Sequence, residues 1–141
     1  MPVLKLLGCL VALLVSCLPV IAGGRIIEGK VTHVRDVDTI VVSGTPIRLN
    51  GVDGPETSTR VGKDAAFFMK RLVEGKVVVC RLNGDRTYDR WVGVCFLDDE
   101  DIGAIAIREG YALDCARYSG GRYRELETRA ARSKIRRAKY C

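Results

Sequence analysis

"DTIVVSGTPIRLNGVDGPET", residues 38–57, contains two short runs of β-branched and apolar residues joined by a Ser-Gly-Thr-Pro turn. Runs of this kind, bounded by turn residues, are typical of consecutive β-strands. The second run ends in Arg48, and a Gly-Pro turn then separates Asp53 from Glu56. Turn chemistry explains the aspartate, the glycine and the proline, but not the arginine or the second carboxylate. The stretch therefore predicts two strands with a candidate site at their ends.

The flanking sequence extends this pattern into a fold. Strands are predicted at 24–36, 38–44, 45–52, 76–82 and 90–97. Helices are predicted at 62–75 from an apolar face that ends at Gly75, at 98–110 from acids at the start and Gly110 at the end, and at 121–139 from a weak apolar stripe. Five strands with a helix between the third and the fourth are the signature of an OB fold. The sequence thus predicts a mainly β protein, a five-stranded OB-fold barrel plus three α-helices.

The beginning of the chain has a different composition from the rest. Residues 1–22 contain one early lysine, an uncharged apolar run and a small residue at Ala22, which predict a signal peptide followed by one domain at 23–141. The domain is then secreted or periplasmic. Two alternatives place it at a membrane: residues 6–22 kept as an anchor, or a lipid on Cys17, because "LVSC" resembles a bacterial lipobox.

Four cysteines lie beyond the predicted signal peptide, and an even number in an exported domain predicts disulfides. Cys80 and Cys95 lie symmetrically about the turn between the fourth and fifth strands, so antiparallel pairing places them opposite each other. Cys115 and Cys141 are predicted to tie the chain end to the loop after the second helix. Zinc is not expected, because there is no Cys-x-x-Cys pair and His33 is the only histidine.

The chain has a formal net charge of +6, and arginines and lysines accumulate from Arg117 onward. Such a face suits a polyanion, although a solvated helix face is the simpler interpretation. The segment lacks an apolar face strong enough for membrane-surface binding.

A second acidic stretch, with Asp36 and Asp38, starts another predicted strand. In an OB barrel these residues converge with Arg48, Asp53 and Glu56. Clustered carboxylates require a cation, and oxygen ligands suit calcium or magnesium. A divalent ion and an arginine stabilise the charge of phosphodiester cleavage, and a spare carboxylate takes a proton from water.

These residues resemble the staphylococcal-nuclease (thermonuclease) family. The resemblance lies in the Asp-x-Asp-Thr of "VTHVRDVDTIVV", the Arg-Leu-x-x-Val-Asp-x-Pro-Glu-Thr of "IRLNGVDGPET" and the Tyr-Asp-Arg-aromatic of "YDRWVG". It covers about residues 25–139. It implies an OB-fold enzyme that uses calcium to hydrolyse phosphodiester bonds of DNA or RNA with low sequence specificity.

The resemblance assigns roles to individual positions. Asp38 and Asp53 match the calcium-binding aspartates, and Gly54 matches the residue whose backbone carbonyl binds the ion. Glu56 matches the residue that activates water, and Arg48 matches the first of two phosphate-binding arginines.

Further positions follow from the same match. Asp36 and Thr39 correspond to residues beside the metal ligands. Arg90, Trp91 and Tyr118 fall near positions that hold nucleotide. Without the resemblance, Trp91 is equally well read as an aromatic of the core or barrel rim, and Tyr118 as a turn residue packed on the barrel.

The chain departs from the family pattern at three positions. Val37 replaces a glycine, and Gly54 replaces a threonine whose hydroxyl is thereby lost. The family continues Tyr-Gly-Arg after its Asp-Arg or Asp-Lys pair. This chain continues Trp91-Val92-Gly93, so the second arginine is missing, Gly93 stands in its place, and Arg86 or Arg90 is the candidate to compensate from a different backbone position. Two functions then remain open: an exported calcium-dependent nuclease of reduced activity, or a nucleic-acid-binding OB module with a degenerate, inactive site.

Overall fold

The structure is a computed structural model that describes residues 24–141. The predicted signal peptide, residues 1–22, lies outside the described residues. No helix in the described part of the chain is long and apolar enough to cross a membrane.

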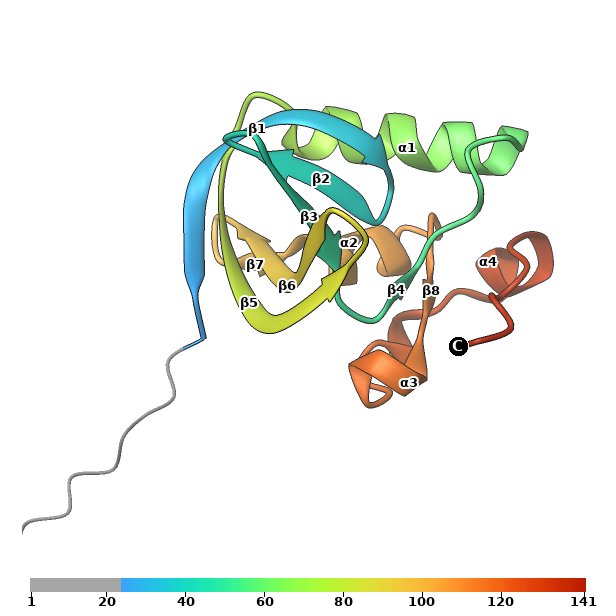
Figure 1. Cartoon of the computed structure of the whole chain (residues 1–141). Coiled ribbons are helices and arrows are strands. Elements are labelled where there is room, and N and C mark those ends of the chain that lie inside the picture. The colour runs from blue at the N-terminus through green and yellow to red at the C-terminus, as the bar shows by residue number, and fades with distance from the viewer. Residues whose placement is uncertain (1–23) are drawn as a thin grey trace, which may run out of the picture.

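Five strands form a closed ring (Figure 1). They pair antiparallel in the order β3-β2-β1-β5-β6, and a parallel pairing of β3 with β6 closes the ring. Helix α1 (Arg60–Val73) lies between β3 and β5 in sequence, so the predicted OB fold is confirmed. The five strands are β1 (Ile26–Asp36), β2 (Thr39–Val42), β3 (Thr45–Leu49), β5 (Val77–Thr87) and β6 (Arg90–Leu97).

The core of the ring follows from alternating β-branched residues. Val31, Ile40 and Ile47 are fully buried, one from each of the first three strands. The turn between β2 and β3 places Ser43 and Gly44 at φ angles of 47° and 82°. Both values are positive, as the tight turns that match strand twist require. The register that follows sets Thr39 opposite Arg48.

Helix α1 covers the ring beside β1 and anchors the loop that carries Glu56. Thr59 caps the helix by accepting a hydrogen bond from the Gly62 N–H at 3.0 Å, and its hydroxyl donates to the Glu56 carbonyl at 2.7 Å. A side chain on Gly62 would collide with the Glu56 carbonyl. A glycine is therefore needed where the helix passes the loop.

The C-terminal part of the chain differs from the prediction. The continuous helix expected over 121–139 is wrong: Glu127 is extended (φ −64°, ψ 126°) and ends a short 3-10 turn. Its buried carboxylate accepts a hydrogen bond from the Asp114 N–H at 2.7 Å, which the straight helix would not allow. The basic residues of this segment therefore do not share one helical face.

The remaining elements are short. Strand β4 (Val52–Asp53) pairs antiparallel with β8 (Leu113–Asp114), and β7 (Glu100–Asp101) pairs antiparallel with β6 at the sheet edge. The others are α2 (Ile102–Arg108), α3 (Ala116–Ser119), η1 (Arg124–Leu126) and α4 (Arg129–Lys134).

Both predicted disulfides are present. Cys80 and Cys95 are direct partners in the β5–β6 register and are fully buried, with Cα atoms 4.0 Å apart. Cys115 is bonded to Cys141, with Cα atoms 4.7 Å apart. The second bond fastens the last residue of the chain to the segment between β8 and α3.

Candidate functional site

The turn from β1 to β2 places one carboxylate under the barrel rim. Asp38 is 8% exposed, and its Oδ2 accepts a hydrogen bond from the Gly54 N–H at 3.0 Å. The same oxygen lies 2.8 Å from Arg48 Nη1, and Oδ1 accepts from the Thr39 hydroxyl at 3.2 Å. Asp36 accepts a hydrogen bond from the Asp38 N–H at 3.2 Å. The Asp-x-Asp-Thr motif thus folds so that its second aspartate, not its first, is buried.

Arg48 is fixed at the end of β3. In addition to its ion pair with Asp38, Nη1 donates to the Val52 carbonyl at 2.9 Å. The guanidinium has five N–H donors, so these contacts leave others to face a ligand.

Asp53 provides a second buried carboxylate. It lies in β4, is 3% exposed, and its Oδ2 accepts a hydrogen bond from the Ala138 N–H at 2.8 Å. This donor comes from the far end of the chain, so the C-terminal segment contributes to the site. The sequence provided no signal for that contact.

Burial dominates the electrostatics of both aspartates. Loss of solvation raises the pKa of Asp38 to about 7, although the Arg48 guanidinium acts in the opposite direction. Burial likewise raises the pKa of Asp53, against the opposing effects of the Ala138 N–H and Arg137. Two carboxylates that are costly to ionise where they lie would be stabilised as anions by a bound cation.

The donor set fits a hard divalent ion in its chemistry. The described residues contain no cluster of three or more carboxylate, histidine or cysteine side chains around one point. What they provide is the carboxylates of Asp38 and Asp53 and the backbone carbonyl of Gly54. These are all oxygen donors, which calcium prefers, and calcium sites commonly include backbone carbonyls and water.

The two departures from the family pattern near this site are coupled. A side chain added at Gly54 would collide with Val37 Cγ1 and would come within 2.9 Å of Asp38 Oδ2. Val37 is fully buried, so its side chain cannot move aside into solvent. Because valine fills the space at 37, only glycine fits at 54.

Glu56 occupies a different environment. It is exposed, and no hydrogen bond or ion pair to its carboxylate exists among residues 24–141. Its backbone is held by the α1 cap, through the Thr59 hydroxyl on its carbonyl. The structure therefore fixes the backbone position of Glu56, and the carboxylate is exposed to solvent.

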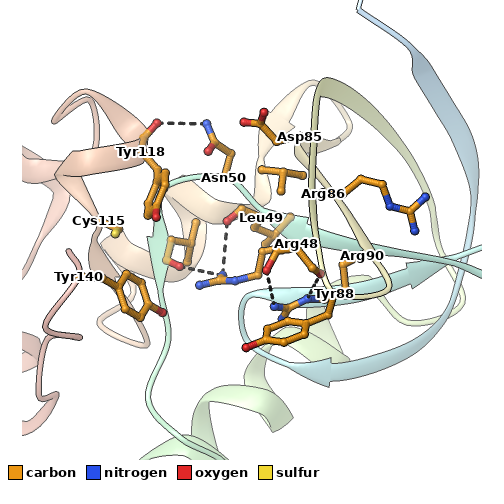
Figure 2. Close-up of a pocket in the computed structure, with 14 residues that line it drawn as sticks. Arg48, Leu49, Asn50, Asp85, Arg86, Tyr88, Arg90, Cys115, Tyr118 and Tyr140 are labelled. Atoms are coloured by element: carbon orange, nitrogen blue, oxygen red, sulfur yellow. Dashed lines mark hydrogen bonds between the residues drawn. The ribbon is translucent and has the colours of Figure 1, made fainter.

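A pocket of about 570 Å³ lies over the ends of β3 and β6. Arg48 and Arg90 both line it, as do Tyr118 and Tyr140 (Figure 2). In the close-up, the two tyrosines lie on one side and Arg90 on the other, with Arg48 between them. Tyr118 was predicted near this place, whereas Tyr140 was not.

Arg90 supplies the second guanidinium of the pocket. Its Nη1 donates to the Thr39 hydroxyl at 3.1 Å, and its Nε donates to the Thr87 carbonyl at 3.3 Å. Thr39 pairs with Arg48 across β2 and β3, so the two arginines are joined through one residue. Tyr88-Asp89-Arg90 then fits the family's Tyr-Gly-Arg, with Asp89 in place of the glycine.

Gly93 does not stand at the place of a missing arginine, and that expectation is wrong. It is buried in β6, and a Cβ there would lie 2.7 Å from the Arg81 carbonyl and 2.9 Å from Leu82 Cδ2. The position faces the packed interior of the ring. An arginine there could not reach the pocket.

Trp91 is not among the residues that line the pocket. It packs against the core with Arg25 over its ring at 5.5 Å and Arg86 over it at 4.5 Å. These contacts favour its interpretation as a barrel-rim aromatic over direct nucleotide contact.

The comparisons place the chain in a family. The family described as "Staphylococcal nuclease homologue" matches residues 46–139, so the chain belongs to it. This membership supports a nuclease-type or nucleic-acid-binding module as the class of protein.

The individual relatives have low sequence identity to this chain, at 29–30%. The succinoglycan biosynthesis protein ExoI of Rhizobium meliloti (strain 1021) is 30% identical over 108 residues, which cover 68% of this chain and 52% of that protein. An uncharacterized protein of Bacillus anthracis is 29% identical, covering 64% and 49%. The staphylococcal-like nuclease CAN1 of Arabidopsis thaliana is 29% identical over 72 residues, covering 51% and 22%. The chain spans about half the length, or less, of these relatives.

The coupling between Val37 and Gly54 is testable by a double-mutant cycle. Gly54→Thr alone should lower the free energy of unfolding by about 1–3 kcal/mol, because the new side chain overpacks the site. In a Val37→Gly background the same change should cost at least about 1 kcal/mol less. Urea unfolding measures each value. A Val78→Ala background, in β5, is the control and should leave the cost unchanged; additivity with Val37→Gly contradicts the coupling.

Proposed function

We propose that the protein is an exported nuclease that hydrolyses phosphodiester bonds of DNA or RNA with low sequence specificity and uses calcium. One observation carries the proposal: Arg48 and Arg90 line the same pocket, and Arg48 is paired at 2.8 Å with the buried carboxylate of Asp38, which does not itself line the pocket. Two guanidiniums, one of them paired with a buried carboxylate, suit the two requirements of this reaction, an anionic substrate and a hard cation. Membership of the staphylococcal nuclease homologue family supports it.

The proposed mechanism assigns a task to each residue. Asp38, Asp53 and the Gly54 carbonyl hold the calcium ion, which supplies positive charge to the phosphate and to its transition state. Arg48 and Arg90 donate hydrogen bonds to phosphate oxygens and bear the charge that develops on them. Glu56 accepts a proton from water as the water oxygen bonds to phosphorus. The P–O bond to the leaving group breaks, that oxygen takes up a proton from solvent, and Glu56 returns its proton to solvent.

A binding module without turnover is the second candidate, and one observation favours it. Asp38 Oδ2 already contacts the Arg48 guanidinium and the Gly54 N–H, at 2.8 and 3.0 Å. This arrangement partly neutralises the carboxylate with no metal ion. A chain that keeps this pair closed would bind nucleic acid through its basic surface and leave the phosphodiester intact.

The proposed location follows from the cysteines. Two disulfides are compatible with an extracellular or periplasmic protein. We extend the proposal to a cleaved signal peptide at residues 1–22, with a retained anchor or a lipid on Cys17 as the alternatives. Intact-mass spectrometry of the protein recovered from the medium, the periplasm and the membrane fraction of an expressing cell distinguishes the three forms.

The second arginine gives a direct test of the active site. Arg90→Ala should lower kcat on single-stranded DNA by roughly 10²- to 10³-fold, the range seen when one preorganised transition-state donor is removed. The matched control is Arg108→Ala, because Arg108 is exposed and paired with Glu100 at 3.0 Å, away from the pocket. Initial rates under saturating substrate provide the comparison. Equal rates for the two variants would remove Arg90 from the mechanism.

A second pair of variants tests proton transfer and metal binding independently of each other. Glu56→Gln should lower kcat by at least about 10²-fold, because the amide cannot accept the proton. Calcium affinity, measured by isothermal titration calorimetry, should remain within about threefold because Glu56 is not a proposed ligand. Asp53→Asn, of nearly equal shape, should lose calcium binding as well. Calcium binding lost in Glu56→Gln and kept in Asp53→Asn would contradict the assignment.

A further inference from the structure

The last six residues of the chain, 136–141, return to the site; they are called the C-terminal tail here. Three of its residues fasten the tail to the rest of the domain. The Ala138 N–H donates to Asp53 Oδ2 at 2.8 Å, and Arg137 donates to the Asp114 carbonyl. Cys141 is bonded covalently to Cys115. The tail is therefore held in one place, because it donates a hydrogen bond to a candidate metal ligand and ends in a disulfide.

Tyr140 is the tail residue that faces the pocket. It lies directly before the half-cystine, lines the pocket, and is 53% exposed. Tyr118 lies three residues after the other half-cystine, lines the same pocket and is also 53% exposed. The two rings form an edge-on pair, with centroids 6.5 Å apart and an interplanar angle of 64°. The disulfide therefore joins the two segments that present these tyrosines.

The arrangement of the pocket suggests what the tyrosines contact. Figure 2 shows Tyr118 and Tyr140 on one side of Arg48, with Arg90 and Tyr88 on the other. A phosphate held by the arginines has its sugar and base attached within a few ångströms. Every nucleobase has a π face, and aromatic side chains bind unpaired bases by stacking with little sequence preference. A pocket of about 570 Å³ is of the size that holds small organic ligands rather than a phosphate alone.

We propose that Tyr140 is a substrate-binding residue that contacts an unpaired nucleobase next to the bound phosphate, and that the Cys115–Cys141 disulfide positions it. This inference rests on the proposed function, because it takes the pocket to hold a phosphodiester. The C-terminal tail then forms one side of the substrate site, and the contacts that hold it lie outside the ring of five strands. Opening the disulfide releases Tyr140, so preference for base-bearing strands depends on the oxidised state of this one bond.

The experiment compares two probes that differ only in their bases. One is a fluorescent single strand of eight thymidines, and the other has the same backbone with abasic sites throughout. Binding is measured by anisotropy in the presence of chelator, so that cleavage plays no part. Wild-type protein should prefer the base-bearing probe. Tyr140→Ala should weaken binding of that probe by roughly 5- to 100-fold, and binding of the abasic probe by less than about twofold.

Two control variants separate stacking from charge and from folding. Tyr140→Phe keeps the ring and should retain the preference. Lys139→Ala removes an exposed charge from the neighbouring position and should weaken binding of both probes equally. A loss of affinity in Tyr140→Ala that is equal for the two probes would overturn the stacking role.

The role of the disulfide is measured in the same assay. Replacing both Cys115 and Cys141 by serine should abolish the preference for bases, and adding Tyr140→Ala to that protein should change it no further. Circular dichroism checks the fold of this variant. If it does not fold, wild-type protein opened at this bond with dithiothreitol, as scored by peptide mapping, replaces it. A preference that survives an open bond overturns the positioning role.

The outcomes distinguish this inference from the function on which it rests. Salt-dependent binding of both probes with equal affinity, unchanged in Tyr140→Ala, overturns the inference and leaves the nucleic-acid function standing. Absence of salt-dependent binding to either probe overturns the proposed function and the inference together.

Discussion

The parallel pairing of β3 with β6 is the constraint on which the site depends. It sets Arg48 beside Val92 and Leu49 beside Gly93, and so closes the ring of five strands. Closure also brings Arg90, at the start of β6, next to Thr39 and Arg48. Residues far apart in the sequence thereby line one pocket. Gly93 takes part in the same pairing, and its position against the Arg81 carbonyl leaves no space for a side chain.

The site retains charged groups that oppose folding. Asp38 and Asp53 are buried, and burial raises the pKa of each, so the unbound protein ionises them at a cost. Arg48 and two backbone N–H groups offset part of that cost. Because these carboxylates have already lost most of their hydration, they give up less hydration free energy when a cation binds to them. The fold thus keeps the proposed calcium ligands in place at the expense of its own stability.

Much of this arrangement could be predicted, and the failures have physical causes. Strand patterning and hairpin symmetry located the ring and the Cys80–Cys95 bond, because both depend on local register. The tail could not be placed, because the contact of Ala138 with Asp53 joins residues 85 apart through a backbone N–H that has no sequence signature. The match to Gly93 fails because it takes Asp89-Arg90 as the family's Asp-Arg pair and so reads the next three residues, Trp91 to Gly93, as Tyr-Gly-Arg. Starting three residues earlier keeps both the tyrosine and the arginine, and the inward-facing backbone at 93 and the contacts of Arg90 agree with that match.

Cleavage of single-stranded DNA under controlled calcium tests the central claim most directly. Purified protein with both disulfides intact is assayed with calcium, with excess chelator, and again after calcium is restored. The account predicts cleavage that stops with the chelator and returns with calcium, because Asp38, Asp53 and the Gly54 carbonyl hold the ion beside the two arginines. DNA that binds in all three conditions and is never cut would contradict the nuclease and leave a binding module in its place.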